Sequence, residues 1–147
     1  MNPPPDVHTP CRRRRLPIRR LLCAAGAGLL VAALPAQADS PARILAAYSA
    51  SAGIPAVAAR GQQFFSAPHG REWQCASCHG AVPVQAGKHA ATAKPIAALA
   101  PAANSERFSD PAKVEKWFRR NCNDVVGREC SAAEKADVLA WLITLKP

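Results

Sequence analysis

The strongest constraint on the fold is the five-residue run Cys75-Ala76-Ser77-Cys78-His79. Two cysteines separated by two residues and followed directly by a histidine form the attachment motif for c-type haem. The two thiols can reach the two vinyl groups on one side of the macrocycle, and the adjacent imidazole then falls near the iron. The spacing therefore predicts one covalent haem c, bonded through Cys75 and Cys78 and ligated at the iron by His79.

Two other kinds of site use cysteines at this spacing. A zinc site needs further thiol or imidazole ligands at suitable positions, and a thioredoxin-like redox pair needs a strand-helix-strand pattern nearby. Neither pattern is visible around Cys75 and Cys78. Covalent attachment also prevents loss of haem from a domain too small to bury it entirely, so haem is the favoured cofactor.

The first 38 residues are organised as a secretion signal. Arginines at 12–15, 19 and 20 precede an apolar stretch over 21–34, and Ala36-Gln37-Ala38 is a small-residue cleavage site. The apolar stretch is shorter than the ~20 residues that span a bilayer, so we expect no membrane anchor in the mature chain. Because c-type haem is attached outside the cytoplasm, we predict cleavage after Ala38, a periplasmic location and one monohaem domain over residues 39–147.

More than half of the net positive charge of the chain lies in the predicted secretion signal, residues 1–38. The 147 residues include 19 basic and 10 acidic ones, with a formal net charge of +9 at pH 7. Residues 1–38 contain six of the basic residues and one of the acidic ones, so the mature domain carries +4. We therefore expect no nucleic-acid partner. The basic residues near 113–120 either steer an acidic redox partner or form an ordinary solvated helix face.

Hydrophobic spacing predicts helices and no strand, so the domain is expected to be all-α. The first helix follows the cleavage site around Ile44, Leu45 and Tyr48, and the second runs from about Pro55 to Phe65. The alanine-, proline- and glycine-rich region 80–107 has neither a helical nor a strand pattern. A loop of this length is unusual unless it packs on something, and a haem edge is a suitable surface.

Two further helices have clear starting signals. Asp110-Pro111 provides an N-cap and a first helical residue, and Ser131-Ala132-Ala133-Glu134 is a capping box. The last helix has an apolar stripe that includes Val138, Leu142 and Leu145. We interpret five aromatic residues as core and haem-packing residues: Phe64, Phe65, Trp117, Phe118 and Trp141.

Four cysteines remain after removal of the signal. Cys75 and Cys78 belong to the haem motif, and an exported chain can hold a disulfide. Cys122 and Cys130 are therefore left as the natural pair.

The residue on the far side of the iron decides the function. Methionine is common there in electron-carrying cytochromes, but Met1 is the one methionine of the sequence and is lost with the signal. The remaining candidates are His69, His89, Lys88, Asn121 and an open position. Asn121 shares an apolar helix face with Val114, Trp117 and Phe118, yet an asparagine near a helix end also makes local backbone contacts. The residues alone leave this choice open.

The mature chain resembles the oxygen-binding class I cytochromes c typified by the sphaeroides haem protein. The resemblance covers most of residues 39–147 and is carried by the runs Lys94-Pro95-Ile96-Ala97-Ala98-Leu99-Ala100-Pro101, Arg107-Phe108-Ser109-Asp110-Pro111-Ala112-Lys113-Val114-Glu115-Lys116-Trp117, Arg120-Asn121-Cys122, Gly127-Arg128-Glu129-Cys130, Glu134-Lys135-Ala136-Asp137 and Trp141-Leu142. These runs are far more specific than the haem motif alone.

The resemblance implies a class I cytochrome c fold and assigns Asn121 as the sixth ligand of ferric iron. It also implies a disulfide between Cys122 and Cys130, and a close crossing of the second and last helices at Gly61. Oxygen or nitric oxide would bind ferrous haem after release of Asn121. A dihaem cytochrome c and a membrane cytochrome b are the electron donors implied.

Three functions follow as expectations. The first is a cytochrome that accepts electrons and binds small diatomic gases. The second is a plain electron carrier whose iron stays six-coordinate in both oxidation states. The third is a small haem enzyme that turns over oxygen, nitric oxide or peroxide. The first is favoured over a true enzyme, because no distal acid-base pair can be identified in the sequence.

Overall fold

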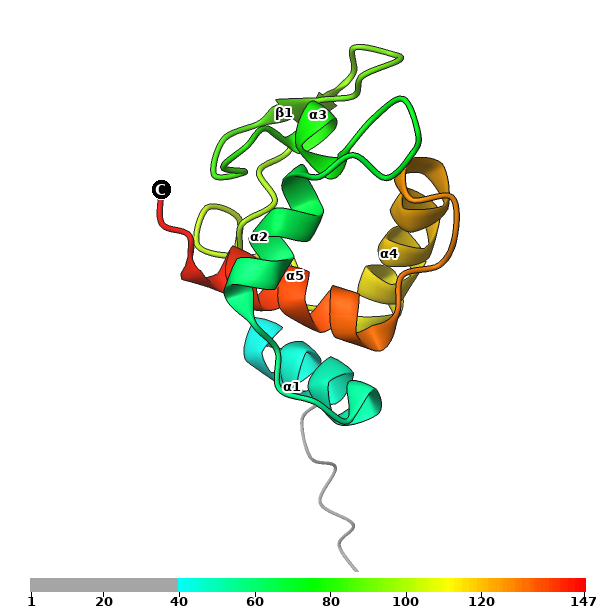
Figure 1. Ribbon diagram of the computed structural model, residues 1–147. Coiled ribbons are helices and arrows are strands. Elements are labelled where there is room, and N and C mark those ends of the chain that lie inside the picture. The colour runs from blue at the N-terminus through cyan, green and yellow to red at the C-terminus, as the bar shows by residue number, and fades with distance from the viewer. Residues whose placement is uncertain (1–39) are drawn as a thin grey trace, which may run out of the picture. The chain divides into compact units, whose positions relative to one another are not determined.

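The computed structural model describes residues 40–147 (Figure 1). The predicted signal, the cleavage site after Ala38 and Asp39 lie outside the described residues. In chain order the elements are α1 (Pro41–Ala52), α2 (Ala58–Ser66), α3 (Cys75–His79), β1 (Gly87–Lys88), β2 (Pro95–Ile96), α4 (Pro111–Val125) and α5 (Ala132–Thr144). The predominance of helix confirms the predicted fold class.

Local capping chemistry explains where the long helices begin. The Asp110 side chain accepts a hydrogen bond from the Lys113 backbone N–H, and Pro111 fixes the first helical φ of α4. Ser131 and Glu134 form the predicted capping box at the start of α5. Both predicted helix starts are confirmed.

The second helix starts later than predicted. It begins at Ala58 rather than Pro55, because Val57 is extended and its backbone N–H donates to Asp137 Oδ1 at 2.6 Å. This long-range hydrogen bond was not visible in the local sequence pattern.

The core is centred on α5, which packs against both α1 and α2. Figure 1 shows α1 below α5, with α2 and α4 rising above α5 on the left and on the right. The buried core side chains come from all the long helices and from one loop: Ile44, Phe65, Phe108, Val114, Val138, Leu139, Trp141 and Leu142. The prediction that Phe65, Trp141 and the apolar residues Val138 and Leu142 of α5 lie in the core is therefore confirmed.

Polar links fix α4 to the two helices below it. Glu115 of α4 accepts hydrogen bonds from Lys135 of α5 at 2.5 Å and from the Tyr48 hydroxyl of α1 at 2.9 Å. The Lys135 ammonium is the main cause of a lowered pKa at Glu115, and burial raises the pKa of Tyr48. The ring of Phe118 packs edge-on against Tyr48, with 5.8 Å between centroids. These contacts set the position of α4 relative to the core.

The structure departs from the all-helical prediction in one small sheet. Gly87 pairs with Ile96 and Lys88 with Pro95 in an antiparallel register. Strands of two residues are too short to show alternation in sequence. Gly87 also lies so close to the backbone of α3 that a Cβ there would overlap the carbonyl group of Cys78. Tertiary packing against α3 therefore shapes this part of the 80–107 loop.

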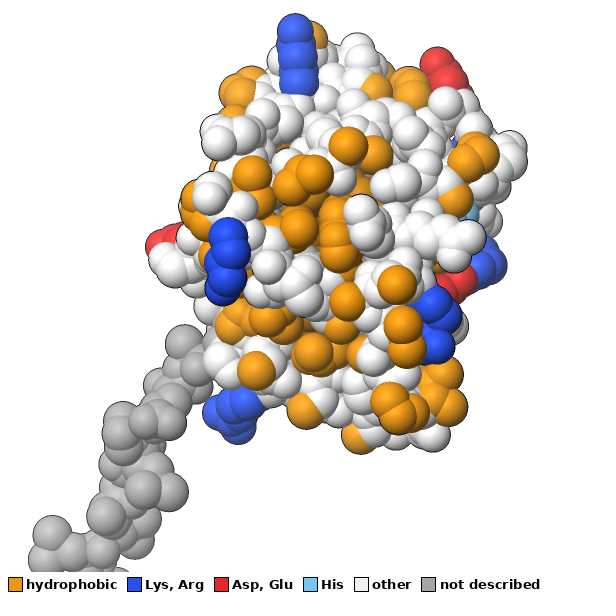
Figure 2. All heavy atoms as spheres, turned by 60° about the vertical axis from the view of Figure 1, so that its left-hand side comes forward, with side chains coloured by type: hydrophobic (Ala, Val, Ile, Leu, Met, Phe, Trp, Pro, Cys, Tyr) orange, Lys and Arg blue, Asp and Glu red, His pale blue; other side chains and the backbone are white. Residues whose placement is uncertain are grey.

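Apolar side chains also form part of the surface. Figure 2 shows a face on which they gather in the centre, with Lys and Arg side chains around them. More than half of a typical protein surface is apolar, so this exposure by itself indicates no partner. Among residues 40–147, no helix is both long enough and apolar enough to cross a membrane.

Candidate haem-binding site

A cavity of about 840 Å³ lies among α2, α3, α4, α5 and the loop that precedes α4. Its volume falls in the range of about 300 to 1,000 Å³ that is typical of ligand and cofactor sites. Apolar walls come from Phe64 and Phe65 of α2, Val114 and Phe118 of α4, and Leu142 of α5. The cavity is therefore suited to a large and mostly apolar group.

One wall of this cavity carries the predicted attachment motif. Cys75 and Cys78 are free thiols on the single turn of α3, and both line the cavity together with His79. Gln74 and Ser77 form a capping box that starts this turn. Burial raises the pKa of Cys75 to about 11, so its sulfur is a protonated thiol at neutral pH.

His79 is neutral at physiological pH. Burial, together with the positive charge of Arg107, lowers the pKa of His79 to about 4. A neutral imidazole can offer a nitrogen lone pair to a metal, whereas a protonated one cannot. The neutral state of His79 and its place in the cavity lining therefore fit the role of an iron ligand.

Asn121 lines the same cavity from α4. It shares the lining with Val114, Trp117 and Phe118, as the helical spacing predicted. Trp117 lines the cavity but does not belong to the core, so of its predicted core and haem-packing roles only the core role is wrong. Its side chain is 42% exposed, and the Arg120 guanidinium lies over its ring at 5.6 Å from the centroid.

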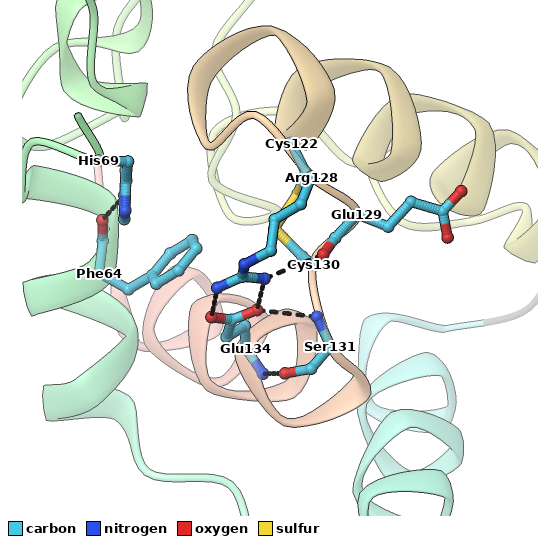
Figure 3. A network of polar contacts seen from close by, with 8 residues as sticks. All are labelled: Phe64, His69, Cys122, Arg128, Glu129, Cys130, Ser131 and Glu134. Carbon is cyan, nitrogen blue, oxygen red and sulfur yellow. Dashed lines mark hydrogen bonds and ion pairs between the residues drawn. A yellow bond between two sulfur atoms is a disulfide. The ribbon is translucent and has the colours of Figure 1, made fainter. Parts of the chain in front are cut away.

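The other candidate ligands are placed less favourably. His69 lies outside the cavity lining, and its Nε2 donates to the Phe64 carbonyl at 2.9 Å (Figure 3). Lys88 is exposed and also lies outside this lining. His89 does line the cavity, but it adjoins α3: the next backbone N–H, that of Ala90, donates to Cys78 Sγ at 3.2 Å.

A disulfide borders the cavity beside Asn121. Cys122 at the end of α4 and Cys130 before α5 are bonded, with Cα atoms 5.7 Å apart. Figure 3 shows this bridge next to the bidentate pair of Arg128 and Glu134, whose contacts measure 2.6 and 2.8 Å. The turn that follows Asn121 is thus held by one covalent and two charged contacts.

Sequence reasoning expected the 80–107 loop to pack on a haem edge, but it gave no individual role to several residues of the cavity wall, among them Arg107 and Phe108. Both lie just before α4, where no periodic pattern marks a buried side chain. Phe108 has a positive φ of 57° and is nevertheless buried. No local signal predicts a left-handed phenylalanine.

The chemistry of the wall fits haem better than zinc. Within the described part of the chain, no group of three or more His, Cys, Asp or Glu side chains could hold a metal ion by itself. Two thiols, one neutral imidazole and apolar walls are instead what a covalently attached porphyrin requires.

Comparisons with known proteins agree with this chemistry. Residues 51–142 match a family model described as a domain of unknown function, DUF1924. The cytochrome c-type protein SHP of Cereibacter sphaeroides is 51% identical over 107 residues, which cover 70% of this chain and 82% of that protein. Cytochrome c'' of Methylophilus methylotrophus is 48% identical over 80 residues, covering 54% of this chain and 56% of that protein.

Solved structures show the same relationship. The structure of oxidised SHP, an oxygen-binding cytochrome c, matches with a TM-score of 0.69 and 47% identity, over 74% of this chain and 99% of that one. Oxidised cytochrome c'' matches with a TM-score of 0.66 and 36% identity, over 73% of this chain and 95% of that one. The chain therefore belongs to the family of the cytochrome c-type protein SHP, and its cofactor is one covalent haem c.

Proposed function

We propose that this chain is a periplasmic cytochrome that accepts electrons and binds a small diatomic gas on ferrous haem once Asn121 has left the iron. The observation that carries the proposal is the lining of one cavity. Cys75, Cys78 and His79 contribute from α3, and Asn121 contributes from α4. Figure 1 shows these two helices on different sides of the ring of elements that surrounds the site.

In this proposal, Cys75 and Cys78 form the two thioether bonds and His79 ligates the iron. The haem, when attached, supplies a redox-active iron that can bind a gas. His79 binds as a neutral imidazole, which agrees with its lowered pKa. The apolar side chains of α2 and α4 exclude water from the macrocycle.

Asn121 is proposed as the sixth ligand of the ferric state. An amide oxygen is a hard, neutral donor that is better matched to ferric than to ferrous iron. Reduction of a haem iron held here would therefore weaken its bond to Asn121, and the side chain would leave room for oxygen or nitric oxide. SHP is an oxygen-binding cytochrome c, which supports the gas-binding part of the proposal. The solution structure of cytochrome c'' concerns haem-ligand detachment, which also supports it.

His89 supports a second candidate, a plain electron carrier with two permanent imidazole ligands, because it lines the cavity. A second imidazole ligand would have to come from a different wall of the cavity than His79. His89 adjoins the α3 wall, and its Nδ1 already accepts a hydrogen bond from the Thr92 backbone N–H at 3.2 Å. The gas-binding function is therefore preferred. We rank a haem enzyme lower still.

Location and partners complete the proposal. We infer that the chain is exported and cleaved after Ala38, and that a dihaem cytochrome c and a membrane cytochrome b supply its electrons. The motif at Cys75 supports export, because haem is attached to it outside the cytoplasm. N-terminal sequencing of the haem-containing protein from a periplasmic fraction tests both the site of cleavage and the location.

The gas-binding function is tested by the visible spectrum of the reduced protein with and without carbon monoxide. We expect a high-spin ferrous spectrum that shifts when the gas is added. A low-spin ferrous spectrum that does not change would overturn the proposal in favour of the plain electron carrier. Turnover of oxygen, nitric oxide or peroxide with a reductant would favour the enzyme.

The ligand assignment is tested by Asn121→Ala. We expect the variant to retain covalent haem and to lose the low-spin ferric spectrum, because Ala offers no donor atom. Asn123→Ala removes an equivalent amide two residues further along α4 and is expected to leave the ferric spectrum unchanged. If Asn121→Ala also leaves it unchanged, Asn121 is not the ligand.

A further inference from the structure

Glu115 joins α4 to two other helices. Its carboxylate accepts a hydrogen bond from the Lys135 ammonium of α5 at 2.5 Å and another from the Tyr48 hydroxyl of α1 at 2.9 Å. The Lys135 ammonium also lies over the Tyr48 ring, 5.6 Å from its centroid. The three side chains therefore form one polar cluster that connects α4 with α5 and α1.

The helix α4 depends on few contacts with the rest of the chain. Within residues 40–147, α5 packs closely against α1 and α2, whereas α4 makes only sparse backbone contact with other helices. The cavity lies beside α4, and Figure 1 shows this helix across the site from α2. Each side-chain link between α4 and another helix is therefore important for the position of α4.

The contact between Glu115 and Lys135 is strengthened by burial. The Lys135 side chain is only 9% exposed, whereas that of Glu115 is 47% exposed. The ammonium is the main cause of the lowered pKa of Glu115, so the carboxylate is ionised at neutral pH. Removing one partner of a buried ion pair is costly, because it leaves a buried charge without compensation. It follows that α4 cannot move away from α5 without leaving Lys135 unpaired.

Phe118 connects this cluster with Asn121. It lies three residues after Glu115 and three before Asn121, and residues at this spacing are neighbours on a helix surface. Its ring packs edge-on against Tyr48, with 5.8 Å between centroids, and both Phe118 and Asn121 line the cavity. At 1.5 Å of rise per residue, Glu115 and Asn121 are about 9 Å apart along one continuous helix. A displacement of α4 at Glu115 is therefore transmitted to Asn121.

Other contacts of α4 have different roles. The ion pair of Arg120 with Asp124, at 4.0 Å, stays within the helix and does not tie it to another element. The disulfide of Cys122 fixes the end of α4 that follows Asn121. Glu115 lies on the other side of Asn121, so its cluster restrains the part of the helix that precedes the proposed ligand.

We propose that Glu115 is a positioning residue for the sixth ligand of the iron: its contacts with Lys135 and Tyr48 hold α4 where Asn121 reaches ferric haem. The inference rests on the proposed ligation by Asn121. When the cluster is lost, α4 is free to move away from the site, and the sixth position of the ferric iron is open in a larger fraction of the molecules.

The test is Glu115→Ala, measured on the haem-loaded protein. We expect covalent haem to remain and part of the low-spin ferric spectrum to be replaced by a high-spin one. The affinity of ferric iron for added imidazole should rise on the order of tenfold, because an external ligand binds in proportion to the fraction of molecules with an open site. The affinity of ferrous iron for carbon monoxide should not change, since Asn121 has already left the reduced iron.

A double variant separates positioning from stability. Glu115→Ala leaves a buried ammonium unpaired, so it also destabilises the fold. Glu115→Ala/Lys135→Met removes both charges, and replacing a buried ion pair by apolar side chains is often neutral for stability. We expect the double variant to recover stability to urea while its high-spin fraction and its imidazole affinity stay raised. A ferric spectrum that recovers together with the stability would overturn the positioning role.

Lys116→Ala is the matched control. Lys116 follows Glu115 directly in α4, but it is exposed and lies outside the cavity lining. We expect this variant to keep the wild-type ferric spectrum and imidazole affinity. If it raised both the high-spin fraction and the imidazole affinity as much as Glu115→Ala does, the effect would not be specific to the cluster and the inference would be wrong.

Two outcomes separate this inference from the function on which it rests. If Glu115→Ala keeps the wild-type ferric spectrum and imidazole affinity, the positioning role is wrong and the proposed function stands. If Asn121→Ala leaves the ferric spectrum unchanged, the proposed ligation fails, and this inference fails with it.

Discussion

Gly61 and Asp137 meet where α2 crosses α5. A Cβ at position 61 would overlap the Asp137 carbonyl group and would lie 2.7 Å from the Val138 backbone nitrogen. The neighbours are backbone atoms of a buried helix, so they cannot move aside as a flexible side chain would. The crossing expected from the family resemblance is therefore present, about one helical turn before Trp141.

We predict that Gly61→Ala destabilises the protein, although Ala is the better helix former by about 1 kcal/mol. Forcing a methyl group into a packed contact costs about 1 to 3 kcal/mol or more. The free energy of unfolding, measured by urea titration, should fall accordingly. Gln62→Ala, at the exposed neighbouring position of α2, is the matched control and should change the stability little. A Gly61→Ala variant as stable as wild type would show that the two helices can separate at low cost.

Asp137 is predicted to be one of the most sensitive polar positions. The residue is 6% exposed, and its carboxylate accepts hydrogen bonds from Val57 N–H and from Nε and Nη2 of Arg60 at 2.6, 2.7 and 3.0 Å. Asp137→Ala leaves all three donors without this acceptor, and we expect a loss of about 1 to 3 kcal/mol in the free energy of unfolding, mainly from the Val57 N–H because the Arg60 side chain can reach solvent. Arg60→Ala should cost less, since Val57 still donates to the carboxylate. If Arg60→Ala lowered the free energy of unfolding more than Asp137→Ala, the arginine rather than the hydrogen bond from Val57 would be the main source of the stabilisation.

Local chemistry made the helix starts at Asp110 and Ser131 predictable, because a cap and its helix lie within four residues of each other. The motif at Cys75 was equally local. The start of α2 was predicted too early, since its cause is a hydrogen bond to Asp137, eighty residues away in sequence. Sequence patterns report neighbours along the chain, and contacts between distant segments leave no such pattern.

The site was only partly predictable for the same reason. Helical spacing predicted that Asn121 shares one face of its helix with Val114, Trp117 and Phe118. The structure places all four residues in the cavity lining. Trp117 was predicted to pack in the core and against the haem, and it lines the cavity without being buried in the core, with the Arg120 guanidinium over its ring. Arg107 belongs to a segment without periodicity, and its place in the cavity wall follows from contacts that only the assembled fold creates.

Glu134 is expected to make stability depend on acid pH. Its contact with Arg128 is the main cause of a pKa that falls from 4.5 to about 2. The folded state therefore binds fewer protons than the unfolded state between these values. The stabilisation is complete above about pH 4.5 and is lost as the pH falls through about 2.

The variant Glu134→Gln isolates this effect, because glutamine can still complete the capping box with Ser131. We expect the variant to lose stability less steeply than wild type between pH 4.5 and 2, as followed by circular dichroism in urea. The wild-type and variant curves should approach each other at the acid end. Parallel curves over this interval would mean that Glu134 does not carry the acid dependence.

The disulfide between Cys122 and Cys130 links local stability to the proposed ligand. Closing a loop of this length stabilises a folded chain by roughly 2 to 3 kcal/mol in the chain-entropy model. The double variant Cys122→Ser/Cys130→Ser should therefore unfold at lower urea concentration while it keeps its haem. Because Asn121 directly precedes Cys122, we also expect its ferric low-spin spectrum to be lost at a lower temperature than in wild type.

Adding a thiol reductant provides the control for this experiment. Reductant should bring the wild-type protein close to the double variant, since thioether bonds to haem resist reduction and the disulfide does not. Reductant also changes the oxidation state of the iron, and the double variant with and without reductant measures that effect alone. If the double variant loses stability but its low-spin spectrum persists to the wild-type temperature, the bridge stabilises the turn without holding Asn121. The position of Asn121 would then be set by the contacts of α4 with Lys135 and Tyr48.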